Sequence, residues 1–316
     1  MDKHDVVVTG VGMIGPLGCS ASDFSRGWRE GRCAETAALP ELAGTLVENN
    51  IAALLPAYDA ARRLGGRRML KFMSEASVLG CIAAQEALRE ADAISRFPAE
   101  HIGLYAGTGL AAANVNDVRA MVEQSIDEDG FFSCRLFGER GLAATNPLLS
   151  FKILANMPPC LISVMEGIKG PSMIFTPWEG QTASAMAEGW RAVSSGQVAC
   201  AVVGASDTAA YPSTLVYLRQ SGHLRKEDYP ASGAAYLVLE RAESALKHGV
   251  RPYVRIKDIK LAYSPDISDP LAARIGRTYA AAPALLLGIA CHCGWKDLSI
   301  CGEDHQECRI DLETLQ

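Results

Sequence analysis

The sequence has few aromatic residues, no long apolar run and no excess of basic charge. Phe, Trp and Tyr make up 7% of its 316 residues, and no run approaches the ~20 apolar residues that span a bilayer. Lys and Arg number 30 against 36 Asp and Glu, so no basic face is available for nucleic acid. The opening "MDKHDVVVTG" contains no apolar signal segment. We therefore expect a cytoplasmic protein that neither enters a membrane nor binds nucleic acid.

The ten cysteines lack the spacing of a disulfide framework or of a metal site. Several lie in apolar runs, as buried free thiols do in a reducing compartment. A C-terminal group could supply four zinc ligands, but its Cys-x-Cys pair is too close for the usual knuckle. The members of this group are Cys291, His292, Cys293, Cys301, His305 and Cys308. We expect no metal and no cofactor, and a metal-binding regulatory protein remains an alternative.

What is present is the alternation of an α/β protein. Apolar runs that end in glycine predict buried strands at 5–10 and 101–109, and a further apolar run predicts one at 198–206. Helical periodicity predicts a core-facing helix over 68–91. The segment 10–18 is expected to be a turn. Its glycines match a dinucleotide fingerprint, but Pro16 follows at once where that fingerprint requires a helix to open. An NAD site is therefore not favoured.

The middle of the chain predicts a helix from 146, a break at Pro158-Pro159, a second helical piece and then a strand "PSMIFT" at 171–176. Residues 110–145 are polar and weakly periodic, which indicates an excursion or a partner-facing segment. The basic run "ARRLGGRRMLK" at 61–71 is typical of a solvated turn, although an acidic carrier partner is left open. After 252 the alternation in "RPYVRIKDIKLAY" predicts a half-exposed strand.

Six blocks in register resemble the N-terminal half of a beta-ketoacyl synthase of the thiolase-like superfamily. They are "VVVTGVGMIGPLG", "FMSEASVLGCIAAQEAL", "HIGLYAGTG", "NMPPCLISVMEGIKGPS", "CAVVGASD" and "ASGAAYLVLERAESALKHG". The resemblance implies a layered α/β/α/β/α fold. It also implies a near-complete N-terminal half, 1–250, and a truncated C-terminal half, 251–316.

The resemblance fails at the family's catalytic groups. In that family a cysteine at a helix N-terminus, following a strand led by Gly-Pro, takes an acyl chain from an acyl carrier protein. Here Gly170-Pro171 place Glu179 at this nucleophile position, with Trp178 beside it as a plug. A carboxylate cannot form a thioester. The family's two histidine turns are also missing, and His305 in "DLSICGEDHQE" is the nearest approach to the first of them.

These departures predict a pseudo-ketosynthase resembling a chain-length factor, with no condensing activity of its own. The resemblance implies a heterodimer with an active ketosynthase, contact with an acyl carrier protein, and a dimer strand at 172–176; a homodimer is possible without a partner. The residues implied for the tunnel or interface are Leu148, Leu149, Phe151, Met157, Ser172, Met173, Ile174, Phe175, Thr176 and Trp178. The alternative from a different class is a Glu179-dependent decarboxylase or hydrolase acting on carrier-bound malonyl or acyl groups.

Overall fold

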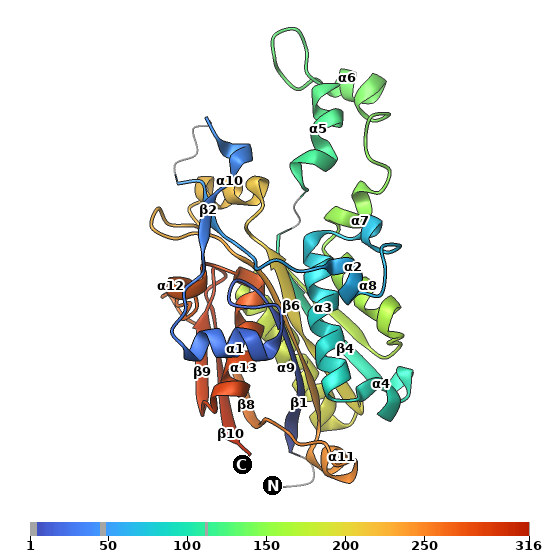
Figure 1. The fold of residues 1–316 in the computed structure, drawn as a ribbon, viewed down its shortest axis with the longest axis vertical. Coiled ribbons are helices and arrows are strands. Elements are labelled where there is room, and N and C mark those ends of the chain that lie inside the picture. The colour runs from blue at the N-terminus through green and yellow to red at the C-terminus, as the bar shows by residue number, and fades with distance from the viewer. Residues whose placement is uncertain (1–4, 45–48, 111–112, 316) are drawn as a thin grey trace.

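The computed structural model describes residues 5–44, 49–110 and 113–315, and is organised around one eight-stranded mixed sheet (Figure 1). The strand order is β5-β4-β6-β7-β1-β8-β10-β9, in which β4 runs parallel to β5 and β6 and every other pairing is antiparallel. The strands are β1 (Val6–Ile14), β4 (Ile102–Thr108), β5 (Ser172–Phe175), β6 (Cys200–Thr208), β7 (Ser232–Arg241), β8 (Val254–Tyr263), β9 (Asp297–Cys301) and β10 (Gln306–Thr314). A separate hairpin-like pair joins β2 (Thr36–Ala38) to β3 (Ile51–Ala53).

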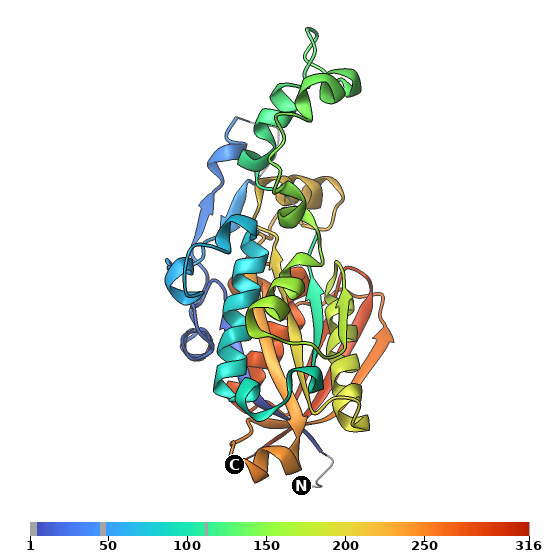
Figure 2. The ribbon, with the colours of Figure 1, turned by 90° about the vertical axis from the view of Figure 1, so that its right-hand side faces the viewer.

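Helices cover the two faces of this sheet. Helices α3 (Glu75–Glu90) and α8 (Met157–Glu166) pack together on one face, as Figure 2 shows. Helices α9 (Glu179–Ser195) and α13 (Ala282–Cys293) lie on the other face, where they contact β6 and β7 and also the last three strands. The main core cluster contains side chains from β1, α9, α13 and β10 together. The early and late parts of the chain therefore share one core, and the division at residue 250 stays a prediction.

The remaining helical segments are short. They are α1 (Ala21–Arg29), α2 (Ala60–Arg63), α4 (Ala93–Arg96), α5 (Val115–Glu123), α6 (Cys134–Leu136), α7 (Leu149–Ile153), α10 (Pro212–Gln220), α11 (Ala242–Lys247) and α12 (Ala272–Ile275), with 3-10 turns η1 (Pro40–Leu42), η2 (Leu70–Phe72), η3 (Ala99–His101) and η5 (Tyr279–Ala281) and a π-helical turn η4 (Phe137–Gly141). No helix among the described residues is long and apolar enough to cross a membrane.

The layered α/β fold expected from the sequence is confirmed, with one difference at its outer side. Strands β8, β10 and β9 bury alternate residues such as Ile256 and Ile310 against α9 and α13. The intervening residues, including Lys257, Lys260 and Arg309, are exposed and charged. The α/β/α/β/α fold expected from the sequence has an outer layer of helices over this face. Among the residues the structure describes no such layer is present, and a charged face can remain in water.

Strand β1 continues to Ile14, through the first part of the segment 10–18 that the sequence predicts to be a turn. Gly10 and Gly12 lie within it, and a Cβ atom at these positions would come within 2.1 Å of the Ala87 carbonyl oxygen and 1.8 Å of the Ala83 carbonyl oxygen. The glycines therefore let α3 approach the strand closely. The predicted turn is therefore found only at 15–18, where Gly15 and Gly18 exchange backbone hydrogen bonds of 3.0 and 3.1 Å. At positions 10 and 12 glycine provides space and not a reversal of the chain.

Two predicted helix boundaries also shift. Helix α3 begins at Glu75 and not near 68, because the Ser74 hydroxyl accepts the Ser77 N–H at 3.2 Å and caps the helix there. Pro158 and Pro159 lie in the first turn of α8 and not between two helical pieces. Proline is tolerated at that place because the first turn has no intrahelical partner for its missing N–H.

The excursion predicted at 110–145 is an arm that carries α5, α6 and η4 away from the sheet (Figure 1). Its base is tied to the segment before α8 because Lys152 Nζ lies 2.7 Å from Asp117 Oδ1. In its far part Phe131 is 71% exposed and Leu142 is 60% exposed.

Candidate functional site: the nucleophile position at the start of α9

Glu179 is the first residue of α9, directly after the loop that leaves the edge strand β5. Its carboxylate is 1% exposed. Arg277 donates from Nη2 to Glu179 Oε1 at 2.9 Å, and the Glu303 backbone N–H donates to Oε2 at 3.2 Å. Both carboxylate oxygens are thus engaged by groups of the chain itself.

The loop after β9 presses directly on this carboxylate. A Cβ atom at Gly302 would lie 2.4 Å from Glu179 Cβ, so only glycine fits there. The next residue, Glu303, supplies the N–H that meets Glu179 and a side chain that also reaches Arg277. The loop that follows β9 therefore closes the nucleophile position from one side.

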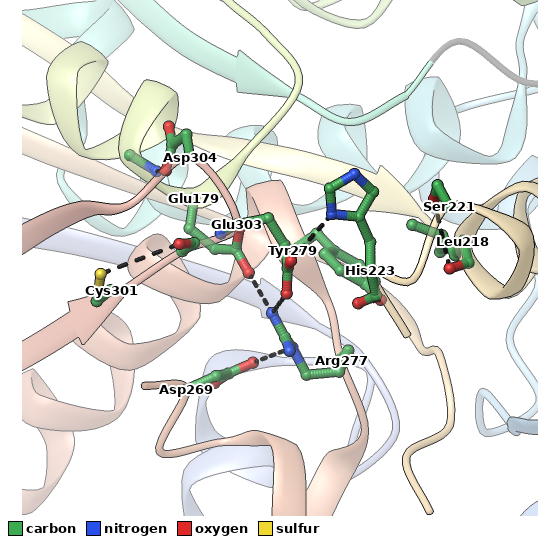
Figure 3. A network of polar contacts seen from close by, with 12 residues as sticks. Glu179, Leu218, Ser221, His223, Asp269, Arg277, Tyr279, Cys301, Glu303 and Asp304 are labelled. Atoms are coloured by element: carbon green, nitrogen blue, oxygen red, sulfur yellow. Dashed lines mark hydrogen bonds and ion pairs between the residues drawn. The ribbon is translucent and has the colours of Figure 1, made fainter. Parts of the chain in front are cut away.

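Arg277 is shared by three carboxylates, as Figure 3 shows. Its Nη2 lies 2.8 Å from Glu303 Oε1, and its Nε lies 3.3 Å from Asp269 Oδ2. The cluster carries three formal negative charges against one positive charge, with the guanidinium 5% exposed. Burial raises the pKa of Glu179 and of Asp269, and the Arg277 charge only partly offsets this rise.

The amide groups at the start of α9 are also occupied. The Gly180 N–H donates to Asp304 Oδ1 at 3.2 Å, and the Gln181 side chain donates to the other Asp304 oxygen at 3.4 Å. Free N–H groups at a helix N-terminus are what could hold a developing oxyanion. A carboxylate of the chain already fills that role here.

Three rings pack beside the carboxylate cluster. The Trp178 ring centroid lies 4.8 Å from that of His223 and 5.9 Å from that of Tyr279. His223 Nδ1 is 3.0 Å from Glu303 Oε2, and the Tyr279 hydroxyl donates to the His223 carbonyl oxygen at 3.2 Å. The rings and the carboxylates thus form one connected group, in which Trp178 has the position expected of a plug.

The histidine expected near this position is elsewhere. His305 has a φ of 56° and its ring lies 6.0 Å from Tyr263, beside a separate surface cavity that also includes Gln181 and Gln306. Glu303, two residues earlier, is the residue that reaches Glu179. His305, the nearest approach to the family's first histidine turn, therefore lies apart from Glu179, beyond the tight turn at 302–305.

Asp207 is a further buried acid that the sequence analysis missed. It lies near the end of β6, is 4% exposed, and accepts the Ala280 N–H at 3.1 Å. Burial raises the pKa of Asp207 to about 8, and the neighbouring Glu179 charge adds to the rise. An aspartate at the end of the apolar run "CAVVGASD" was the available signal.

The residues predicted for a tunnel or interface lie outside this cluster, apart from Trp178. Met173 and Ile174 on the edge strand are 46% and 39% exposed, with Ser172 exposed and Phe175 partly buried beside them. Thr176 follows the strand and donates to the Gly109 carbonyl oxygen at 3.3 Å. Leu148 and Leu149 are partly buried, Phe151 packs on Phe72 with ring centroids 5.6 Å apart, and Met157 packs against the core beneath α3.

The C-terminal cysteines and histidines do not gather. They are distributed over α13, β9, the 302–305 turn and β10, and all ten cysteines are free thiols. In the described part of the chain no group of three or more His, Cys, Asp and Glu side chains is placed to hold a metal ion. The metal-binding alternative thus finds no support in this arrangement.

Comparison with known proteins agrees with this fold and places the chain in a family. Residues 3–245 match the beta-ketoacyl synthase N-terminal domain. A curated relative, 3-oxoacyl-[acyl-carrier-protein] synthase 2 of Synechocystis sp. (strain ATCC 27184 / PCC 6803 / Kazusa), is 25% identical over 285 residues. That match takes in 80% of this chain and 61% of the relative, so the chain spans less than two thirds of the relative's length.

Solved ketosynthase structures share the fold at low sequence identity. The ishigamide ketosynthase/chain length factor has a TM-score of 0.80 at 16% identity, with 100% of both chains covered. A beta-ketoacyl synthase from Burkholderia phymatum STM815 has a TM-score of 0.79 at 13% identity, covering 99% of this chain and 100% of the other. A type II polyketide ketosynthase solved in complex with its acyl-carrier protein has a TM-score of 0.78 at 15% identity, covering 98% and 99%. Because the family match covers most of the chain, the protein belongs to the beta-ketoacyl synthase family.

Proposed function

We propose that this protein is a non-condensing ketosynthase-like subunit of fatty-acid or polyketide synthesis that pairs with an active ketosynthase, in the manner of a chain-length factor. The observation that carries the proposal is the ion pair between Glu179 and Arg277 at the nucleophile position, with both side chains at most 5% exposed. A group that must attack a thioester has to be a free nucleophile within reach of substrate. Glu179 is neither.

The surroundings of Glu179 argue against condensation as well. The N–H group that could stabilise an oxyanion donates to Asp304, and Glu303 occupies the point at which the 302–305 turn meets α9. A decarboxylase or hydrolase that uses Glu179 as a base would need the carboxylate free of Arg277. The subunit role is the function that the geometry supports best.

The open edge of the sheet supports pairing with another chain. Strand β5 is the last strand on its side of the sheet, and Met173 and Ile174 on it are substantially exposed. An edge strand with unpaired backbone groups and apolar side chains readily adds another strand. We assign this edge to the ketosynthase partner, and the proposal extends to Leu148, Leu149, Phe151 and Met157 as candidates for a shared acyl tunnel.

The exposed cations after α2 support contact with an acyl carrier protein. Arg67, Arg68 and Lys71 are exposed on the α3 side of the molecule, and an acidic carrier would be steered toward them. One structural neighbour is a ketosynthase solved with its carrier protein.

Co-expression with the ketosynthase and carrier protein encoded beside this gene, followed by sizing and mass measurement, tests the pairing. We expect a stoichiometric heterodimer that Ile174→Lys disrupts. The matched control is Leu246→Lys on α11, where the leucine is 63% exposed and lies outside the β5 edge. A monomer or homodimer that ignores every ketosynthase, or equal loss with both variants, would reject pairing through β5.

Measuring carbon dioxide release from carrier-bound malonyl groups tests the enzymatic alternative. We expect no turnover by this chain alone, and we expect Glu179→Gln to leave the activity of the paired ketosynthase unchanged. Carbon dioxide release that disappears in Glu179→Gln would instead assign a catalytic role to this carboxylate.

A further inference from the structure

A cavity of about 410 Å³ lies on the α3 side of the sheet, away from the α9 face that carries Glu179. Its walls come from α2, from α3 and from the loop that follows β1. Arg62, Arg63 and Arg89 line it together with the apolar side chain of Ile82 and the ring of Tyr58. Its volume is within the range of small-molecule sites.

The three guanidinium groups of this cavity have no carboxylate partner. None of them forms an ion pair within the ranges 5–44, 49–110 and 113–315 that the structure describes. Arg63 donates one N–H to the Cys19 carbonyl oxygen, which holds its side chain at the cavity wall. Arg62 and Arg89 are exposed at the same cavity.

Two acids also line the cavity, but backbone amides hold both of them. Asp59 Oδ1 accepts the Arg62 N–H at 3.0 Å, which caps α2. Glu86 accepts the Ala21 N–H at 3.0 Å and the Met13 N–H at 3.2 Å through its two oxygens. Burial raises the pKa of Glu86, and its backbone hydrogen bonds and the nearby charge of Arg63 only partly offset this rise. The three arginines of the cavity thus stand against two acids. The cavity therefore keeps unpaired positive charge above an apolar wall.

We propose that this cavity binds a small phosphate ester, with the phosphate on the arginines and the organic part against Ile82 and Tyr58. The planar guanidinium group presents paired N–H donors that match phosphate oxygens. Burial raises the pKa of Tyr58 to about 12, so its hydroxyl stays a donor at neutral pH. This inference does not rest on the proposed subunit function, because the cavity and the nucleophile position lie on opposite faces of the sheet.

Titration calorimetry of the full chain at about 0.15 M salt tests this site, with inorganic pyrophosphate and coenzyme A as probes. We expect saturable binding of both, tighter for coenzyme A because it adds an organic part. The double variant Arg62→Gln/Arg89→Gln should weaken binding about tenfold or more, since each charge-assisted hydrogen bond lost contributes at that scale. Both substituted residues are exposed, so folding should be preserved.

The matched control is Arg67→Gln/Arg68→Gln, which removes the same charge from two exposed residues of the same basic run that do not line the cavity. A change of less than about twofold in this control supports a built site. Equal weakening in both double variants would overturn the proposal in favour of a diffuse basic surface. The absence of saturable binding of either probe up to about 1 mM would also overturn the proposal. This outcome includes the case in which the basic surface binds only an acidic protein.

Discussion

Two buried glutamate–arginine pairs in this molecule use the same side chains in opposite ways. Glu240 on β7 is 0% exposed and meets Arg96, 6% exposed, through both carboxylate oxygens at 2.9 and 2.5 Å. The Thr9 hydroxyl donates to the same carboxylate at 2.8 Å. One negative charge thus meets one positive charge. At the start of α9, Arg277 instead serves Glu179, Asp269 and Glu303.

The difference teaches that burial and pairing alone do not define a structural ion pair. The Glu240 pair is balanced and links β7 to the segment after α3. The Arg277 cluster has surplus negative charge, and the charge of Glu179 contributes to the raised pKa of the nearby Asp207. A surplus that is removed from water favours protonation of some of its members. We therefore expect the contribution of the Arg277 cluster to stability to depend on pH.

The largest expected effect comes from Arg277→Met, which leaves three buried carboxylates without their shared cation. We expect the free energy of unfolding at pH 7 to fall by about 3–5 kcal/mol, because unpaired buried charge is costly. Urea denaturation measures this. The loss should shrink as the pH is lowered from 7 to 5, because burial raises the pKa of Glu179 and of Asp269 and so favours their protonation; an equal loss at both pH values would contradict the surplus-charge interpretation.

The balanced pair should come next. Glu240→Gln leaves the Arg96 guanidinium buried without a counter-charge, and we expect a loss of about 3 kcal/mol at pH 7. The control is Glu139→Gln, which breaks an exposed pair with Arg135 whose side chains are 55% and 71% exposed. That variant should cost no more than about 0.5 kcal/mol. If both variants cost the same, burial would not be the reason for the difference.

Asp207→Asn should change how the free energy of unfolding depends on pH. A carboxyl group whose pKa is raised on folding binds its proton more tightly in the folded state than in the unfolded state. Below the unfolded pKa near 3.8 both states are protonated, so the group does not destabilise the fold there. As the pH rises toward the folded pKa of about 8, stability falls. We expect Asp207→Asn to flatten this decline and to add about 1–2 kcal/mol at pH 8, measured by urea denaturation. An unchanged slope would show that Asp207 is ionised in the folded protein.

Glu179→Gln should have the smallest effect. It removes one surplus negative charge, and the glutamine oxygen can still accept the Arg277 N–H, so we expect a change within about 1 kcal/mol of zero in either direction. Thermal and urea unfolding of this variant, measured side by side with Glu240→Gln, test this expectation. A loss as large as that of Glu240→Gln would show that the Arg277 cluster is also a balanced structural pair.

Local sequence pattern was sufficient for most of the fold and for two neighbouring members of the site, Trp178 and Glu179. The apolar runs that became β1, β4 and β6 were identified because a buried strand is marked by its own side chains. Glu179 was found through its distance from Gly170-Pro171. Arg277 and Glu303 were not, because they lie in aperiodic loops 98 and 124 residues from Glu179.

The sequence by itself determined the order of strands and helices, the membership of a recognisable family and the loss of a cysteine at the nucleophile position. Each of these is written in residues close together in the chain, through periodicity and glycine spacing. Only the tertiary structure decided what surrounds Glu179 at that position. An arginine shared by three carboxylates pairs with it, and Glu303 and Trp178 lie beside the pair. It also decided that β5 is left open at the edge of the sheet. The partners of a buried charge, the loops that cover it and the strands left unpaired at a sheet edge all depend on contacts between distant segments. Local sequence patterns do not predict them.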